Sequence, residues 1–375
     1  MNYNKINNIA GWVVFLIAAI VYVSTVEPST SLWDCGEYIT TSYKLEVGHP
    51  PGAPVFMMIG RIFSAFTSPE SAAYMINIVS ALSSAFAILF LFWTVTHFAK
   101  KIILNDDKKL SEGAIYAIIG SGVVGALAYT FSDSFWFSAV EGEVYAMSSF
   151  FTAITFWAIL KWEDNSHLIS SDRWIILMFF LIGLSIGVHM LNLLVIPAAG
   201  FVYYFKKYDF SWKGFLITGI VSVGILGFIQ AVFINESIKI ASAFEKMFTN
   251  SFGSSFNIGT IGFFIFVLGG LGGAIYYFHI KGKRVYHMIS MSLTVIIVGF
   301  ASFAMVVVRS NANPPLDEND PESLPSLQSY LAREQYGSWP TAYGEYWNSP
   351  QKQTTEKSKI SFLTPNIKCF YSNFL

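Results

Sequence analysis

Residues 72–98 read AAYMINIVSALSSAFAILFLFWTVTHF and contain no Asp, Glu, Lys or Arg. A helix needs roughly 20 largely apolar residues to cross about 30 Å of membrane hydrocarbon. This stretch is long enough, so it predicts a transmembrane helix. The composition agrees, because 54% of the 375 residues are hydrophobic and only 13% are charged. That is about half the charged fraction of an ordinary soluble domain, which excludes a water-soluble globule.

Seven further stretches lack all four charged residue types, and these are 9–26, 113–131, 144–160, 174–205, 214–234, 258–278 and 286–308. Residues 174–205 are ambiguous, because a single helix of that length would extend about 48 Å, well beyond the hydrocarbon thickness. Two short spans fit better, joined by a hairpin near His189 and Asn192. The sequence therefore predicts an all-α polytopic membrane protein with about nine transmembrane helices.

The distribution of basic residues favours the nine-span arrangement. With the amino terminus inside, the inner loops hold 13 Lys and Arg, and the short outer loops hold 4. If residues 174–205 crossed once, the same residues would divide 9 to 8. Cytoplasmic loops normally carry the excess of Lys and Arg, so we expect the amino terminus inside and the carboxyl terminus outside. The net charge of -1 gives no overall basic field for a nucleic-acid partner.

Three segments then lie on the outer side: the loops 27–71 and 132–143, and the tail from Arg309. Residues 53–66 are apolar but too short to span, so they predict a helix lying on the membrane surface. The tail opens with a Pro-rich, acidic stretch that reads as a linker. We expect a transmembrane domain over 1–308 and an incomplete extracytoplasmic tail over 309–375, whose last residues, 358–375, continue no earlier pattern.

Asp34 and Glu37 follow the first span in Leu32-Trp33-Asp34-Cys35-Gly36-Glu37-Tyr38. Because they are three residues apart, the two carboxylates share one face if this stretch is helical. One could act as a base on a substrate hydroxyl while the other tunes or positions it. The alternative is a capping box, since Ser31 to Asp34 and Asp34 to Glu37 both have its spacing.

His49 begins a rigid turn, His49-Pro50-Pro51-Gly52-Ala53-Pro54, which is either a structural corner or a wall of a binding site. Glu141, Glu143 and Tyr145 lie at the outer entry to the fourth span. Acidic residues there either favour the start of the helix or belong to a site.

Arg61 and Arg309 flank the outer surface, where they either bind a phosphate or extend from the membrane border. His189 and Asn192 either line a cavity or form a satisfied turn. No spacing of His, Cys, Asp and Glu indicates a metal site. The sequence contains no phosphate-binding loop and no HExxH motif either.

Several of these motifs together resemble one family of multi-span proteins, which includes transmembrane protein 260 and large bacterial relatives. The likeness covers about residues 9–350. It is carried by Asp34-x-Gly36-Glu37, His49-Pro50-Pro51-Gly52-x-Pro54, Gly187-Val188-His189-Met190-Leu191-Asn192, Asn313-Pro314-Pro315-Leu316-Asp317-Glu318-Asn319 and Tyr330-Leu331-x-Arg333-Glu334-Gln335-Tyr336-Gly337.

The family is regarded as protein O-mannosyltransferases of the GT-C superfamily, so the resemblance implies a GT-C-like helical bundle. It implies Asp34 as the base that deprotonates a Ser or Thr hydroxyl, and Glu37 as its supporting acid. It also implies a polyprenyl-phosphate sugar as donor and inversion at the sugar carbon. Residues that could bind substrate or stabilise the leaving phosphate are His49, Arg61, Glu141, Glu143, Tyr145, His189, Asn192, Arg309 and Arg333. Family members are often longer, so this chain looks carboxyl-terminally truncated.

The expected function is transfer of a sugar, mannose by resemblance, from a polyprenyl-phosphate donor to Ser or Thr of exported proteins. No cofactor beyond this donor is expected, and the partners are membrane lipid, the lipid-linked sugar and the acceptor protein. The alternatives are a transporter or lipid flippase, and a GT-C enzyme that glycosylates a lipid or glycan. A bacterial inner membrane with a periplasmic site is the first expectation, and the endoplasmic reticulum membrane is the alternative.

Overall fold

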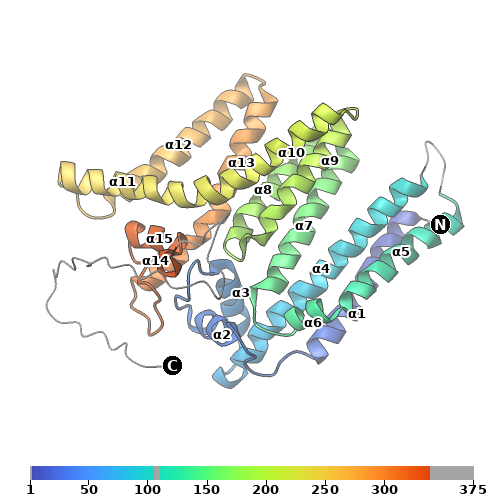
Figure 1. The fold of residues 1–375 in the computed structure, drawn as a ribbon, viewed down its shortest axis with the longest axis horizontal. Coiled ribbons are helices and arrows are strands. Elements are labelled where there is room, and N and C mark those ends of the chain that lie inside the picture. Colours follow the sequence, from blue (N-terminus) through green and yellow to red (C-terminus); the bar gives the residue numbers. More distant parts are fainter. Residues whose placement is uncertain (1, 105–109, 338–375) are drawn as a thin grey trace, which may run out of the picture. The chain divides into compact units, whose positions relative to one another are not determined.

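The computed structural model describes residues 2–104 and 110–337 of the chain, and these residues are helical throughout apart from connecting turns and one isolated β-bridge (Figure 1). The expected all-α polytopic membrane protein is confirmed. Eight helical segments in the described ranges are long and apolar enough to cross a membrane. They are Tyr3–Ser24, Pro69–Ile103, Glu112–Thr130, Val144–Asn165, Ile169–Ile186, Trp212–Phe252, Ile258–Ile280 and Arg284–Ser310.

The expected break within residues 174–205 is confirmed. Helix α8 covers Asp172–Ile186, a short 3-10 turn, η3, covers Met190–Leu194, and α9 covers Val195–Lys207. With 13 residues, α9 is too short to count among the eight helices. The fully buried Asn192 stabilises the break, because its side-chain amide donates to Ser185 Oγ at 2.8 Å.

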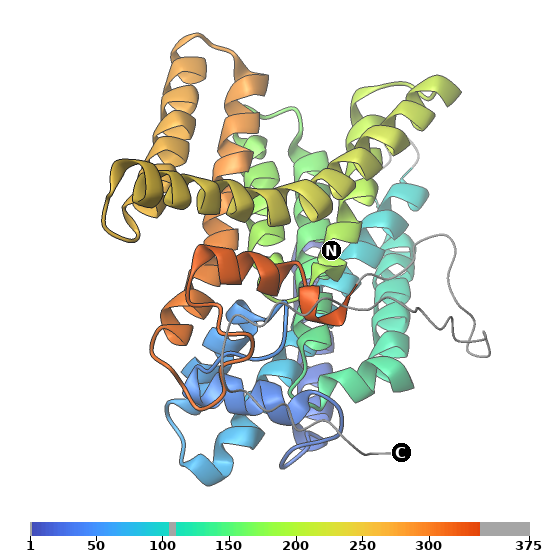
Figure 2. The same cartoon turned by 60° about the vertical axis from the view of Figure 1, so that its left-hand side comes forward.

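The chain is helical where the sequence predicted a span to residue 234 followed by an outer loop. Helix α10, Trp212–Gly227, continues through the π-helical turn η4, Phe228–Phe233, into α11, Ile234–Phe252. Figures 1 and 2 show α11 running at a steep angle to α12, Ile258–Ile280, and α13, Arg284–Phe300. The charged residues of α11 ended the apolar pattern, but they did not end the helix.

Three long helices form the first half of the bundle: α1, Tyr3–Ser24, α4, Ala72–Ile103, and α5, Glu112–Thr130. The buried Tyr22 ties two of them together by donating its hydroxyl to the Thr130 carbonyl at 2.9 Å. Helix α7, Val144–Asn165, packs against α4 and carries α8 on its other side.

The segments expected on the outer side hold short helices. These are α2, Cys35–Lys44, α3, Pro54–Ser64, α6, Asp133–Ala139, and α15, Leu324–Leu331. The expected helix over 53–66 is present as α3. Its residues Val55, Phe56 and Met57 are buried against other helices, so this face packs in the protein core and not on lipid.

The described part of the tail packs on the helices beyond its Pro-rich, acidic opening. After α14, Ala304–Ser310, the chain returns to pack on the helices, and Leu327, Tyr330 and Leu331 are buried in a core cluster shared with α7, α8 and α9. Residues Met1–Gln335 accordingly form one compact unit. The run 358–375 lies outside the described residues.

Candidate active site

Asp34 lies at the amino-terminal end of α2 with its side chain 58% exposed. The proposed capping box is not formed, because the Asp34 side chain makes no capping hydrogen bond. Ser31 instead donates its hydroxyl to Glu141 Oε2 at 2.6 Å. The Asp34 carboxylate is therefore not committed to its own helix, and the capping alternative for this residue is wrong.

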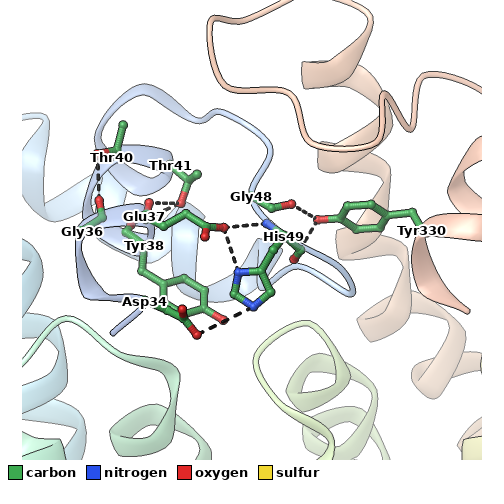
Figure 3. Close-up of polar contacts among 9 residues, drawn as sticks. All are labelled: Asp34, Gly36, Glu37, Tyr38, Thr40, Thr41, Gly48, His49 and Tyr330. Atoms are coloured by element: carbon green, nitrogen blue, oxygen red, sulfur yellow. Dashed lines mark hydrogen bonds and ion pairs between the residues drawn. The ribbon is translucent and has the colours of Figure 1, made fainter. Parts of the chain in front are cut away.

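Glu37, in the first turn of α2, is bonded to His49 (Figure 3). Its Oε1 atom accepts the His49 backbone N–H at 2.6 Å and lies 2.9 Å from His49 Nδ1. Burial opposes ionisation of Glu37, but the hydrogen bonds and charge of His49 outweigh it and lower the pKa of the carboxyl. The hydrogen bond to Glu37 in turn raises the pKa of His49, against the effect of burial. This pair therefore favours a carboxylate bonded to an imidazolium.

The other imidazole nitrogen faces Asp34, with His49 Nε2 4.0 Å from Asp34 Oδ2. Figure 3 shows His49 in contact with both acids, with Glu37 at one ring nitrogen and Asp34 facing the other. Potential ligand atoms of the three residues lie within 4.8 Å of one another, so the group could also hold a metal ion. The sequence indicated no metal site, because His49 is too far along the chain from the acids to form a recognisable motif.

The loop that carries His49 is held by the tail, a contact that the sequence did not predict. Val47 pairs with Asp317 in the isolated β-bridge. The buried Tyr330 donates its hydroxyl to the Gly48 carbonyl at 2.6 Å. Gly52 has a φ of +73°, and a Cβ there would lie 2.6 Å from the Tyr330 hydroxyl, so only glycine fits beside this ring.

Glu318 is a second tail residue that sequence reasoning missed. Its backbone N–H donates to the Val47 carbonyl at 3.1 Å. Burial and the neighbouring charge of Glu37 raise the pKa of Glu318, while His49 lowers it. Both Glu318 and Tyr330 belong to motifs of the family resemblance, which was the one signal that could have pointed to them.

Glu141 and Glu143 lie on the segment before α7 and are both 5% exposed. Glu143 caps α7 by accepting the Val144 backbone N–H at 3.0 Å. Burial raises the pKa of Glu143 to about 7, and the charges of Asp34 and Glu141 add to this. Glu143 thus caps a helix and is also a neighbour of Asp34. The two roles considered for it, helix start and site residue, are therefore compatible.

Tyr145 and His189 lie together, with ring centroids 5.4 Å apart. His189 caps η3 by accepting the Leu191 backbone N–H at Nδ1, 3.1 Å away. Burial and the charge of Arg333 lower the pKa of His189, which favours the neutral ring. The structure therefore brings Tyr145 of α7, His189 of the hairpin and Arg333 of the tail close together.

The two arginines expected to bind phosphate are engaged elsewhere. Arg61 donates to the Tyr43 carbonyl at 2.6 Å, and Arg309 donates to the carbonyls of Lys44 and Leu45. These carbonyls belong to the carboxyl-terminal end of α2, where cations are favourable. Both contacts favour a structural role, and the predicted phosphate role of these arginines has no contact in its support. Asn192 likewise makes structural contacts, to Ser185 and Thr155.

The fold and this site define a multi-span helical membrane protein with a carboxylate and histidine cluster where several helices begin or end. Residues 34–212 match the family model described as the protein O-mannosyl-transferase TMEM260 N-terminal domain. The resemblance to a TMEM260-like family drawn from the sequence is thus confirmed over these residues.

Two curated relatives agree with this assignment. The chain is 28% identical over 226 residues to protein O-mannosyl-transferase tmem260 of Dictyostelium discoideum, covering 57% of this chain and 25% of the relative. It is 28% identical over 151 residues to protein O-mannosyl-transferase TMEM260 of Mus musculus, covering 40% of this chain and 19% of the relative. The chain thus spans about a quarter or less of the length of these relatives. No solved structure matches it.

Proposed function

We propose that the chain is a GT-C type glycosyltransferase that moves mannose from a polyprenyl-phosphate donor to Ser or Thr hydroxyls of exported proteins. Support comes from the names of the two relatives, both protein O-mannosyl-transferases. The observation that carries the chemistry is the cluster in which His49 contacts both Glu37 and Asp34, beside the start of α2. Both relatives come from eukaryotes. We keep both expected locations as proposals, the endoplasmic reticulum membrane and a bacterial inner membrane.

In this proposal Asp34 is the base. Its exposed carboxylate accepts the proton of the acceptor hydroxyl while the hydroxyl oxygen attacks the anomeric carbon of the sugar. The bond from that carbon to the phosphate oxygen breaks, and the lipid phosphate leaves with the electron pair. Asp34 lies at the amino-terminal end of α2, where a helix favours negative charge.

Glu37 then has a different role from the supporting acid implied by the family resemblance. Its lowered pKa and its two bonds to His49 suit a carboxylate that positions the imidazole. A protonated His49 places a cation 4.0 Å from the Asp34 carboxylate. We assign to it the stabilisation of the leaving phosphate, a role that groups aimed at developing negative charge commonly have.

The test is transfer by the purified chain in detergent, with an acceptor peptide and either polyprenyl-phosphate mannose or GDP-mannose. Transfer is expected from the lipid donor only. Asp34→Asn keeps the shape of the side chain but is a far weaker proton acceptor, so the rate should fall by a factor of about 10² to 10⁴. Glu236→Gln, on the exposed face of α11, is the matched control. Transfer from GDP-mannose alone, or near-normal turnover by Asp34→Asn, would contradict the proposal.

A further inference from the structure

A cavity of about 1030 Å³ lies at the far end of the same helices that carry the candidate active site. It is lined by the first turns of α1 and by the last turns of α4 and α7. Asp34 follows the other end of α1, and Glu143 caps the other end of α7. The cavity and the candidate active site are therefore at opposite ends of this bundle.

The charged residues of the cavity leave an excess of positive charge. Among the described residues that line the cavity, Lys100, Lys101 and Lys161 are basic, and Asp164, 3.6 Å from His97 Nδ1, is the one carboxylate. Lys101 forms an ion pair with Glu163, which also lies 3.1 Å from His97.

The other two lysines rest against aromatic rings. The ammonium group of Lys100 lies 5.1 Å from the centre of the Tyr3 ring, and that of Lys161 lies 5.2 Å from the centre of the Trp157 ring. A cation on an aromatic face keeps its other side available to an anion. Two ammonium groups are thus held at the wall of a polar cavity, an arrangement that suits a phosphate.

The surroundings of the cavity favour a lipid over a soluble ligand. Trp12 lines it and is 47% exposed, and Ile9 and Leu16 of the same helix are 55% and 54% exposed. Helix α1 is a candidate membrane span, so these side chains offer an apolar track for acyl chains beside the cavity. Tryptophan is enriched at the depth of lipid headgroups, and the distribution of basic residues places this end of α1 inside.

We propose that this cavity binds the headgroup of one anionic glycerophospholipid of the inner leaflet. Lys100 and Lys161 bind its phosphate, and the amides of Asn4 and Asn8 at the cavity wall bind its glycerol hydroxyls. Basic pockets between transmembrane helices on the cytoplasmic side commonly bind anionic lipid headgroups. The site does not depend on the proposed transferase activity, because it is at the other end of the bundle.

The test measures lipid binding to the full chain in detergent by native mass spectrometry, with phosphatidylglycerol or phosphatidylcholine of the same acyl composition. One phosphatidylglycerol per chain is expected to bind in preference to phosphatidylcholine. Each of Lys100→Gln and Lys161→Gln should weaken binding about fivefold, and the double variant about thirtyfold. Lys213→Gln removes an exposed lysine at the start of α10, outside the cavity lining, and should change nothing.

Two further measurements keep the result unambiguous. Lys100→Arg preserves the positive charge and should keep binding, which separates loss of charge from loss of fold. Glycerol 3-phosphate should fail to displace the lipid, because it lacks acyl chains. Equal binding of the two lipids, full binding by the double variant, or displacement by glycerol 3-phosphate would each overturn the proposal.

Discussion

Replacing Glu37 by Gln tests the link between the Glu37 carboxylate and the His49 imidazole. The amide has the size of the carboxylate and keeps an oxygen for the His49 backbone N–H, but it carries no charge. Two charge-assisted bonds, at 2.6 and 2.9 Å, thus become neutral ones. Hydrogen bonds to charged groups contribute about 1.5 to 3 kcal/mol and neutral ones about 0.5 to 1.5 kcal/mol. Because both side chains are about one-fifth exposed, we expect the variant to lose about 1 to 2 kcal/mol of stability.

The sign of the pH effect follows from the raised pKa of His49. A carboxylate stabilises the imidazolium, so the stability gained from this pair is present below the ordinary histidine pKa and is lost as pH rises through the raised value. The neutral amide lowers the pKa of His49 toward its ordinary value. In Glu37→Gln the alkaline limb of kcat/KM for mannosyl transfer should therefore move to lower pH.

The measurement is a pH profile of kcat/KM with the lipid donor, together with thermal unfolding of the detergent-purified chain. Glu236→Gln is again the control, because Glu236 pairs with Lys239 on an exposed face, with side chains 45% and 58% exposed. An unchanged alkaline limb in a folded Glu37→Gln variant would refute the assignment of His49 as the cation of the site.

Two other predictions concern the tail and the topology. Tyr330→Phe removes the bond to the buried Gly48 carbonyl and should cost about 1 to 3 kcal/mol in thermal or chemical unfolding, and an unchanged stability would mean that this contact does not hold the His49 loop. In a cysteine-free background, a cysteine at Ser68 should react with an impermeant reagent from outside and one at Lys213 should not, and the reverse pattern would contradict the orientation derived from the basic residues.

The transmembrane helices were predictable because their signal is local. An uncharged apolar stretch of sufficient length has few alternatives in water or lipid. The break inside 174–205 followed from the length of that stretch together with the distribution of basic residues. Helix α11 was missed for the complementary reason. Glu236, Lys239 and Glu245 interrupt the apolar pattern, yet one face of the helix packs against α12 and α15.

The candidate site was only partly predictable. The residue types and the carboxylate pair were visible in the sequence, but the partner of Glu37 was not. Helix α2 ends at Leu45 in a left-handed conformation with a φ of 51°, which turns the chain and brings His49 back beside Glu37. Tyr330, which holds that loop, is 282 residues from its partner Gly48. Contacts of this kind depend on tertiary packing that no local pattern contains.

Arg61 and Arg309 lie near the candidate site, as the sequence predicted, but their contacts are structural and not those of a phosphate site. Arg61 comes from α3 and Arg309 from α14, and both donate to carbonyls at the carboxyl-terminal end of α2. The acids Asp34 and Glu37 lie at the amino-terminal end of the same helix, so the charges at both ends oppose the helix dipole. Because α2 is held at its far end by two separate elements, its first turn has a fixed position relative to His49. In the proposed mechanism the two arginines thus fix the position of Asp34. His49, and neither arginine, stabilises the donor phosphate.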